Sequence, residues 1–278
     1  MNNFTRTTTK TLAMLIATAA PLTLTTPSLA AGPEHNHAAD AKAPTMDAKA
    51  KKVWDKSNKA TLGENAEKRE VKTVRMTGTM SLPAQGINAD MNILIVSGKG
   101  MVLNIEIPGL GAFNQGVSGD VVWSSDMMSG PKILDEDEAG ILLDQMDLYA
   151  DLNWEEHYES ISYKGQETLT MPDDTKIETD VLELTSIKDQ TVTTNYYASD
   201  TGLLARTDTL TAMAGSKIPS TSYTSDYREI EGMMFAFTTV ASVGPNKQLI
   251  EFTEIDINGE VDDSELELPE DIKELLED

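Results

Sequence analysis

The sequence predicts a mainly β protein of the α+β class, an antiparallel meander of about ten or eleven strands with one buried helix in mid-chain. From residue 71 to residue 257, segments that alternate apolar and polar residues recur between turn residues. A strongly apolar helical segment at 135–150 interrupts them. Cysteine is absent from all 278 residues, so disulfides are excluded and an apolar core must hold the fold.

The first 30 residues have the pattern of a secretory signal peptide. Arg6 and Lys10 are their only charges, residues 11–23 form an apolar run, and Ala30 ends a small-x-small cleavage sequence. We expect export through the Sec pathway, cleavage after about Ala30 and a periplasmic location. The apolar run is too short to span a bilayer and no later run is long enough, so we expect a mature protein that does not span the membrane.

The mature chain is strongly acidic. Without Arg6 and Lys10, 20 basic residues stand against 46 acidic ones, a net charge of −26. This charge repels nucleic acids and anionic lipid surfaces, so we expect no nucleic-acid partner. We interpret the acidity as an adaptation to solubility or salt, with attraction of cationic partners as the alternative.

Residues 31–45 are rich in Ala, Pro and His and predict a disordered linker before a single domain at 46–278. The domain is expected to begin with a helix at 46–60 that ends at Gly63 and carries Met46, Ala50, Val53 and Trp54 on one face.

Alternation predicts the strands that follow. In the first of them, at 71–83, Val74, Met76, Met80 and Leu82 share one face with Gly78. Further strands are expected at 89–96, 99–107, a short piece that leads to a strand ending at Trp123, 159–170, 177–187, 191–198, 203–212, 220–229, 233–243 and 247–257.

The stretch 99–131 is the most informative. Met101, Leu103, Ile105 and Ile107 lie on one face of its first strand, and the loop after its second strand contains Met127 and Met128. The stretch fits either an ordinary β core with an apolar turn or one wall of a cavity for an apolar ligand. Methionine adapts to varied apolar partners, which favours the second interpretation.

Two helices are expected beyond this stretch. The segment 135–150 has an acidic first turn, which suits the positive end of a helix dipole, and is apolar around a wide arc that includes Leu142 and Met146. We expect it to lie across the sheet or to plug the open side of a barrel. In the tail 266–278, Leu268 and Pro269 are expected to dock before an acidic helix that ends near Leu276.

Several of these segments resemble the periplasmic lipoprotein-carrier superfamily of LolA and LolB, in the branch of outer-membrane lipoprotein-sorting proteins. The segments are VRMTGTMSLP, IPGLGAFNQGVSGDVVWSSDMMSGP, NYYASDTGLLAR and YTSDYREIEGMMFAF, within a resemblance that covers 46–268. The resemblance implies a curved, unclosed β-barrel with a helical lid over an apolar cavity that binds acyl chains. The carriers have an arginine on the strand that matches 99–107, whereas KGMVLNIEI has none.

The apolar residues expected to line this cavity come from the strands, the loop and the mid-chain helix. In the pairs Met127–Met128 and Met233–Met234, one member should face away from the core if the strand alternates. The predicted set is Met91, Met101, Leu103, Ile105, Trp123, Met127, Met128, Leu142, Met146, Met233 and Met234.

No enzymatic motif emerges from the sequence. The histidines that remain after cleavage are His35 and His37, in the linker, and His157 beside three glutamates, where the spacing is not that of a metalloprotease helix. No G-x-S-x-G motif is present. We expect no catalytic residue, metal or cofactor.

The sequence therefore predicts a periplasmic carrier that binds acyl chains of lipoproteins or lipids and sorts them toward the outer membrane, with inner- or outer-membrane lipoprotein machinery as possible partners. The alternative is an envelope-stress or outer-membrane-assembly adaptor that uses the same fold to bind proteins.

Overall fold

The computed structural model describes residues 43–64, 70–127, 129–135, 139, 142–143, 153–213 and 216–277. In these residues fourteen strands form one sheet, in the order β1-β8-β9-β10-β11-β12-β13-β14-β2-β3-β4-β5-β6-β7. The strands are β1 Thr45–Met46, β2 Thr73–Leu82, β3 Ile87–Val96, β4 Gly100–Ile107, β5 Gly111–Ser118, β6 Val121–Asp126, β7 Gly130–Ile133, β8 Tyr158–Thr170, β9 Lys176–Ser186, β10 Val192–Ala198, β11 Leu204–Met213, β12 Ser216–Ile230, β13 Met233–Val243 and β14 Asn246–Ile257.

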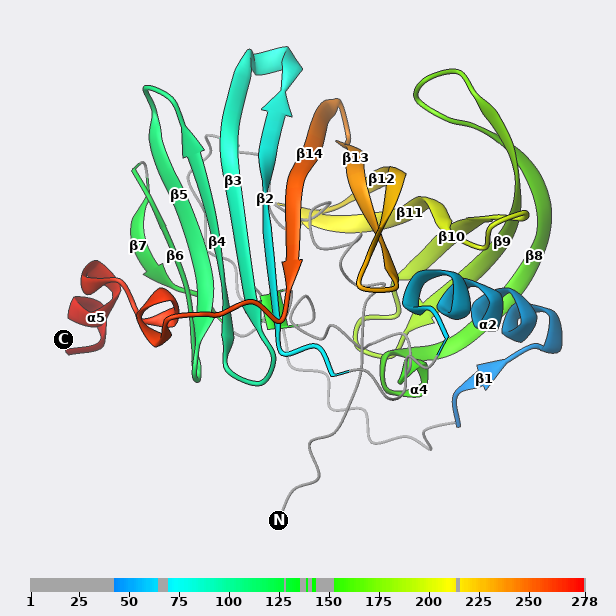
Figure 1. Cartoon of the computed structure of the whole chain (residues 1–278), viewed down its shortest axis with the longest axis horizontal. Helices are drawn as coiled ribbons and strands as arrows, with labels where there is room; N and C mark the ends of the chain where they lie inside the picture. Colours follow the sequence, from blue (N-terminus) through cyan, green and yellow to red (C-terminus); the bar gives the residue numbers. More distant parts are fainter. Residues whose placement is uncertain are drawn as a thin grey trace.

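The sheet curves strongly and does not close into a barrel, because its two end strands, β1 and β7, have no pairing with each other among the described residues (Figure 1). All neighbouring strands run antiparallel except β1, which is parallel to β8. The mainly β prediction is confirmed. The number of strands exceeds the expected ten or eleven, and the predicted set contained neither the two-residue β1 nor the four-residue β7, which are too short to show alternation.

One face of the sheet, here called the inner face, carries most of the apolar core. Burial alternates residue by residue along β2 and β13, so Met76 and Met80 point to this face together with Phe235 and Phe237. The strand register continues the face through β3, β4 and β14. The opposite, outer face carries the exposed polar residues of the same strands.

A second apolar cluster lies on the inner face of β8, β9 and β10. It packs against α2 (Ala48–Leu62), whose Ala50 and Trp54 are buried against Leu182, Leu184 and Tyr197. Asp47 caps this helix by accepting hydrogen bonds from the N–H groups of residues 49 and 50, both at 2.9 Å. The predicted helix is confirmed from Ala48 onward, with Ala50 and Trp54 buried and Val53 half-buried, as is its end at Gly63, whose φ of 73° suits glycine. Met46, which was expected on the same helical face, lies instead in β1.

The mid-chain segment expected as a helix is described at only a few positions. Residues 139, 142 and 143 are helical, and the N–H of Ala139 donates to the carbonyl of Asp135 at 2.8 Å, the spacing of an α-helical turn. Ala139 and Leu142 are buried in the inner-face cluster, whereas Leu143 is 48% exposed. The described part of the segment therefore packs on the sheet through one face.

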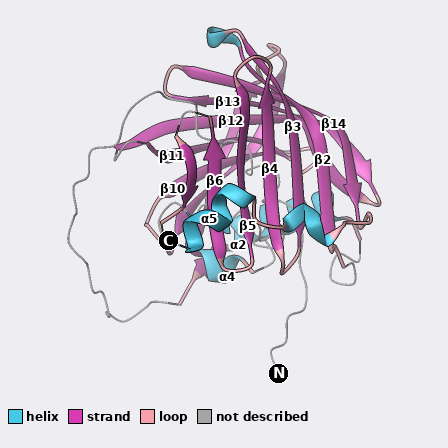
Figure 2. Ribbon diagram, turned by 90° about the vertical axis from the view of Figure 1, so that its left-hand side faces the viewer, coloured by secondary structure: helices cyan, strands magenta, loops and turns pink. Residues whose placement is uncertain are grey.

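The C-terminal segment crosses the outer face. It contains the short helix η3 (Asp263–Leu266) and α5 (Glu270–Glu277), and Figure 2 shows α5 in front of the strands at the β5–β6 end of the sheet. Ser118 on β5 donates to the carbonyl of Leu266 at 2.6 Å, and Ser125 on β6 donates to Asp271 at 2.8 Å. The predicted acidic tail helix is confirmed, with its end at Glu277. Leu268 and Pro269, which were expected to dock before it, are half-buried, and their docking stays a prediction. Two other short helices, η2 (Pro83–Gln85) and α4 (Trp154–His157), join strands.

Candidate functional site

The inner face brings four of the predicted cavity residues together. Met91 on β3 is paired with Ile105 on β4, and four positions further along β3, Ile95 is paired with Met101. Leu103 lies between them on the same face of β4. All are at most 6% exposed and belong to one apolar cluster. The alternation read from the sequence thus assigned them to the correct side of the sheet; their contact with a ligand stays a prediction.

Two further predicted residues reach this cluster from elsewhere in the chain. Met233 enters from the first position of β13, and Leu142 enters from the mid-chain helical segment. Met234 follows Met233 on an alternating strand and therefore faces the outer side, opposite Glu229, where it is partly exposed. The pair behaves as alternation requires, with one methionine on each face.

Trp123 lies on the outer face. Val122, its neighbour on β6, belongs to the inner-face cluster, and Trp123 is paired with Gly116 on β5. A Cβ atom at Gly116 would lie 2.9 Å from the indole ring, so the ring fills the space that glycine leaves. Trp123 is only 2% exposed. Its burial comes from this outer-face packing, and the structure separates it from the methionines of the inner face.

Of the two loop methionines, Met127 is described, and it does not line the inner face. Met127 is 75% exposed in the turn between β6 and β7, and its side chain lies over Gly111, the first residue of β5. Met128 and Met146 lie outside the described residues. The outer loop therefore presents an apolar side chain to solvent, beside Leu110, which is 61% exposed.

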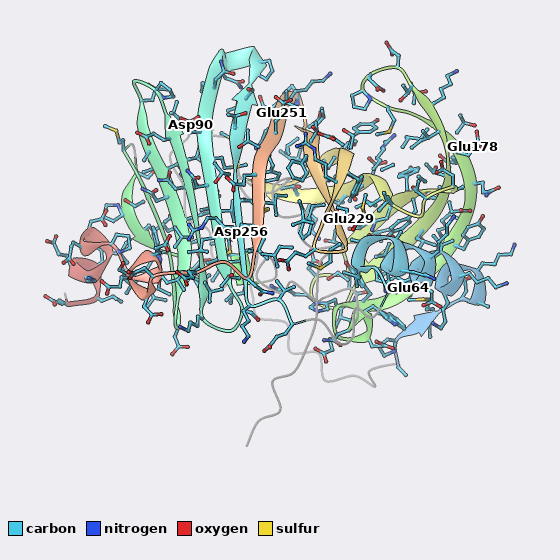
Figure 3. All side chains as sticks on the ribbon, in the orientation of Figure 1. Glu64, Asp90, Glu178, Glu229, Glu251 and Asp256 are labelled. Atoms are coloured by element: carbon cyan, nitrogen blue, oxygen red, sulfur yellow. The ribbon has the colours of Figure 1, made fainter. Side chains whose placement is uncertain are left out.

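The acidic surface shows no gathering of metal ligands. The residues labelled in Figure 3 are all exposed, and only Glu251 and Asp256, both on β14, share an element; the others are Glu64, Asp90, Glu178 and Glu229. Among the described residues no three His, Asp or Glu side chains converge to hold a metal ion. His157 ends α4, and its carbonyl accepts from the N–H of Ile187 at 3.0 Å. The predicted absence of catalytic and metal sites stays a prediction.

Sequence reasoning missed a polar zone on the inner face, between the two apolar clusters. On β12, residues 220, 222 and 224 point to this face because they pair with Val243, Ala241 and Thr239 of β13. The register continues across the sheet to Thr207 on β11, Asn195 on β10 and Gln248 on β14. Part of the signal was present in the sequence, since every second residue of β12 from 220 to 224 has a small hydroxyl side chain, whereas their partners Ala241 and Val243 on β13 are apolar.

The inner face also carries an ion pair at the other end of β12. The guanidinium of Arg228 lies 4.1 Å from the ring centroid of Phe237 and pairs with Asp226 at 2.6 Å. The hydrogen bond from Arg228 to Asp226 raises the pKa of the guanidinium, which stays charged. About half of each side chain is exposed, so this end of the zone is open to solvent.

Comparisons with known proteins identify the fold. A domain described as an outer membrane lipoprotein-sorting protein, from Vibrio parahaemolyticus, superposes with a TM-score of 0.53 at 13% identity, over 82% of this chain and 100% of that one. A LolA superfamily protein from Nitrosomonas europaea gives 0.52 at 12% identity, over 79% and 97%. The fold is LolA-like. A DUF1329 family protein from Desulfovibrio piger shares this LolA-like fold, with a TM-score of 0.55 at 12% identity over 78% and 97%.

The other comparisons give no closer assignment. No family model matches the sequence, and no curated protein matches it. In the described residues no helix is both long and apolar enough to cross a membrane. The resemblance noted in the sequence therefore holds at the level of a LolA-like fold.

Proposed function

We propose that the protein is a periplasmic binding protein for acyl chains of lipoproteins or lipids, which it carries toward the outer membrane. The observation that supports this proposal is the apolar inner face, where residues of β2, β3, β4, β13 and β14 form one cluster with Ala139 and Leu142. Proteins with LolA-like folds include one described as a lipoprotein-sorting domain.

Burial of an acyl chain supplies the binding energy. Each methylene removed from water contributes about 0.8 kcal/mol, so about ten buried methylenes supply the roughly 8 kcal/mol that micromolar affinity requires. Met76, Met80, Met91 and Met101 on the inner face are unbranched and adapt to chains of varied shape. Ala139 and Leu142, which pack on the cluster, would move away from it to admit the chain.

A fluorescent fatty-acid titration of the purified protein tests the proposal. We expect saturable binding and displacement of the probe by a lipopeptide. The position of the chain is tested with a brominated fatty acid, which quenches tryptophan on contact, in two variants of β4. Leu103→Trp places the reporter on the inner face, and Glu106→Trp places a matched reporter on the exposed outer face of the same strand.

Quenching of the reporter at 103 and not of the reporter at 106 would support the proposal. Absence of saturable binding, or equal quenching at the two positions, would contradict it. Saturable capture of the peptide part of a lipopeptide after its acyl chain has been removed would favour the adaptor function instead.

A further inference from the structure

Three buried polar atoms in the polar zone of the inner face have no hydrogen-bond partner. They are Ser220 Oγ, Ser222 Oγ and Gln248 Nε2, and their residues are 2%, 5% and 7% exposed. A buried polar group without a partner destabilises a fold, so native proteins rarely keep one without a reason. Here three such groups occur on one face of neighbouring strands.

The three side chains share one part of the inner face. Ser222 is paired with Ala241, and Ala241 is paired with Gln248, so the serine and the glutamine flank a single alanine across β13. Strand spacing puts their Cα atoms about 9.6 Å apart. The methyl group of Ala241 is small, which leaves the two polar ends separated by little side-chain volume. Ser220 lies two residues from Ser222 on the same face of β12.

Neighbouring polar groups of the same face are satisfied within the protein. Thr207 donates to Asn195 at 2.8 Å, the hydroxyls of Thr193 and Thr209 lie 2.9 Å apart, and Thr224 donates to the carbonyl of Leu204 at 2.8 Å. The hydroxyls of β10 and β11 thus serve the fold. The three residues Ser220, Ser222 and Gln248 differ in having no hydrogen-bond partner for these side-chain atoms. They lie between the two apolar clusters, where an acyl chain bound to the inner face would pass.

The chemistry of the three atoms defines what they recognise. A serine hydroxyl and a glutamine amide nitrogen can each donate a hydrogen bond, and a neutral carbonyl oxygen accepts one. Their cross-strand partners on β11 and β13 include Val243, Ala241 and Thr207, and none of these three is charged. The nearest inner-face cation on β12, Arg228, is six residues from Ser222, about 20 Å along the strand, and pairs with Asp226. The zone therefore suits a neutral acceptor better than a carboxylate.

We propose that Ser220, Ser222 and Gln248 form a polar subsite that hydrogen-bonds the ester or amide carbonyl groups of an acylated ligand, so that the protein selects acyl esters and amides over free fatty acids and hydrocarbons. This inference rests on the proposed acyl-chain binding and specifies its ligand class. The subsite fixes the position of the linkage while the apolar clusters on either side hold the hydrocarbon.

Competition among ligands of matched length tests the subsite. Methyl palmitate, N-methylpalmitamide, octadecane and palmitate, delivered from cyclodextrin, compete with the fluorescent fatty acid. We expect the ester and the amide to displace it at concentrations at least tenfold lower than octadecane, because each hydrogen bond made to a donor otherwise left without a partner adds to affinity. Palmitate should also bind more weakly than its methyl ester.

The variant S220A/S222A/Q248M removes the donors and nearly preserves volume. The preference for ester over octadecane should fall by about tenfold or more, while octadecane binds as before. Since unpartnered groups have been removed, Tm should rise by about 2–4 °C per residue. The matched control is Thr224→Val, on the same face of β12, where loss of the hydrogen bond to Leu204 should lower Tm and leave the preference unchanged.

The outcomes separate the two proposals. If no competitor displaces the probe and the probe itself does not bind, acyl-chain binding fails. If all four competitors bind equally, or if the triple variant keeps the full preference for the ester, the subsite is overturned and acyl-chain binding stands. A lower Tm in the triple variant would show that the three side chains serve the fold and would also overturn the subsite.

Discussion

Leu142 and Leu143 are adjacent residues with opposite environments. Leu142 is 3% exposed and packs in the inner-face cluster, whereas Leu143 is 48% exposed. Leu142→Ala removes buried methyl groups and leaves space beneath the helical segment, so the free energy of unfolding should fall by about 2–4 kcal/mol. Leu143→Ala, the matched control, should change it by less than about 0.5 kcal/mol. Urea denaturation measures both, and equal effects would contradict the packing described for this segment.

Asp47 joins α2 to the sheet through three backbone hydrogen bonds. Its carboxylate accepts from Lys49 and Ala50 in the first turn of the helix and from the N–H of Tyr163 on β8, at 2.7 Å. The bond from Ala50 and then that from Tyr163 lower the pKa of Asp47 below 3.8. Because the pKa is lower in the folded state, the stabilisation is present above the unfolded value near 3.8 and is lost as the pH falls through the folded value.

The variant Asp47→Asn tests this linkage. Asparagine keeps an acceptor for the helix cap but does not titrate. The wild type should be the more stable protein at pH 6, and the difference in free energy of unfolding should shrink as the pH falls below about 4. Urea unfolding at several pH values gives this difference. A difference that stays constant down to pH 2 would show that the charge of Asp47 does not stabilise the fold.

Among the elements, the C-terminal segment stabilises the outer face without reaching the candidate site. Arg75 on β2 pairs with Glu265 at 2.8 Å, and Lys99 pairs with Asp263 at 3.0 Å. Further along, Ile272 of α5 is wholly buried while Leu276 is 49% exposed. The exposed ion pairs contribute little, so the packing of Ile272 is the main attachment.

Two substitutions in α5 distinguish its contribution to stability from ligand binding. Ile272→Asp places a charge in a buried position and should lower the free energy of unfolding by more than about 2 kcal/mol. Leu276→Asp, at an exposed position of the same helix, should have little effect. Neither should change acyl-chain affinity in the folded protein, because α5 lies on the outer face. Loss of affinity in folded Ile272→Asp would place α5 in the site and contradict this separation.

At this scale the sequence predicted most strands to within a few residues, because period-two alternation follows directly from burial of one face. Met91, Met101, Leu103 and Ile105 were assigned to one face for that reason. Trp123 was predicted to lie with them because its strand is short and both Val122 and Trp123 are apolar, so alternation does not show which of the two side chains faces the core. In the structure Trp123 lies on the outer face, where Gly116 has no side chain and therefore leaves room for the indole ring.

The polar zone could not be predicted as a site because it depends on the pairing register across three successive strands, β12, β13 and β14. Ser222 lies on β12 and Gln248 on β14, with the whole of β13 between them in the chain. Only the pairing of both residues with Ala241 of β13 shows that they lie on one face with one residue between them. Sequence alternation shows that small hydroxyl residues share a face of β12. It does not show which of these hydroxyls find a hydrogen-bond partner: Thr224 donates to the carbonyl of Leu204, whereas Ser222 has no partner.

At the scale of the whole sheet, most charged side chains of the described residues lie on the outer face and most of the apolar core lies on the inner face, with the Arg228–Asp226 pair as an exception. Acidic side chains such as Asp90 and Glu251 are exposed on the outer phase of their strands, and the clustered apolar residues lie on the inner phase. Binding on the inner face should therefore depend on chain length and hardly on ionic strength. For a series of neutral methyl esters, affinity should rise about fourfold per added methylene and then level off once the chain exceeds the apolar surface.

Raising NaCl from 20 to 500 mM should leave the affinity of these esters unchanged or slightly tighter, because exposed charges are screened while apolar burial is not. A cationic amphiphile of the same chain length is the control. The net charge of −26 in the chain without its first 30 residues attracts it at low salt, so its affinity should fall as salt rises. Isothermal titration calorimetry should also give a negative heat-capacity change for the esters. An ester affinity that does not vary with chain length but falls steeply with salt would show that the ligand binds the acidic outer face.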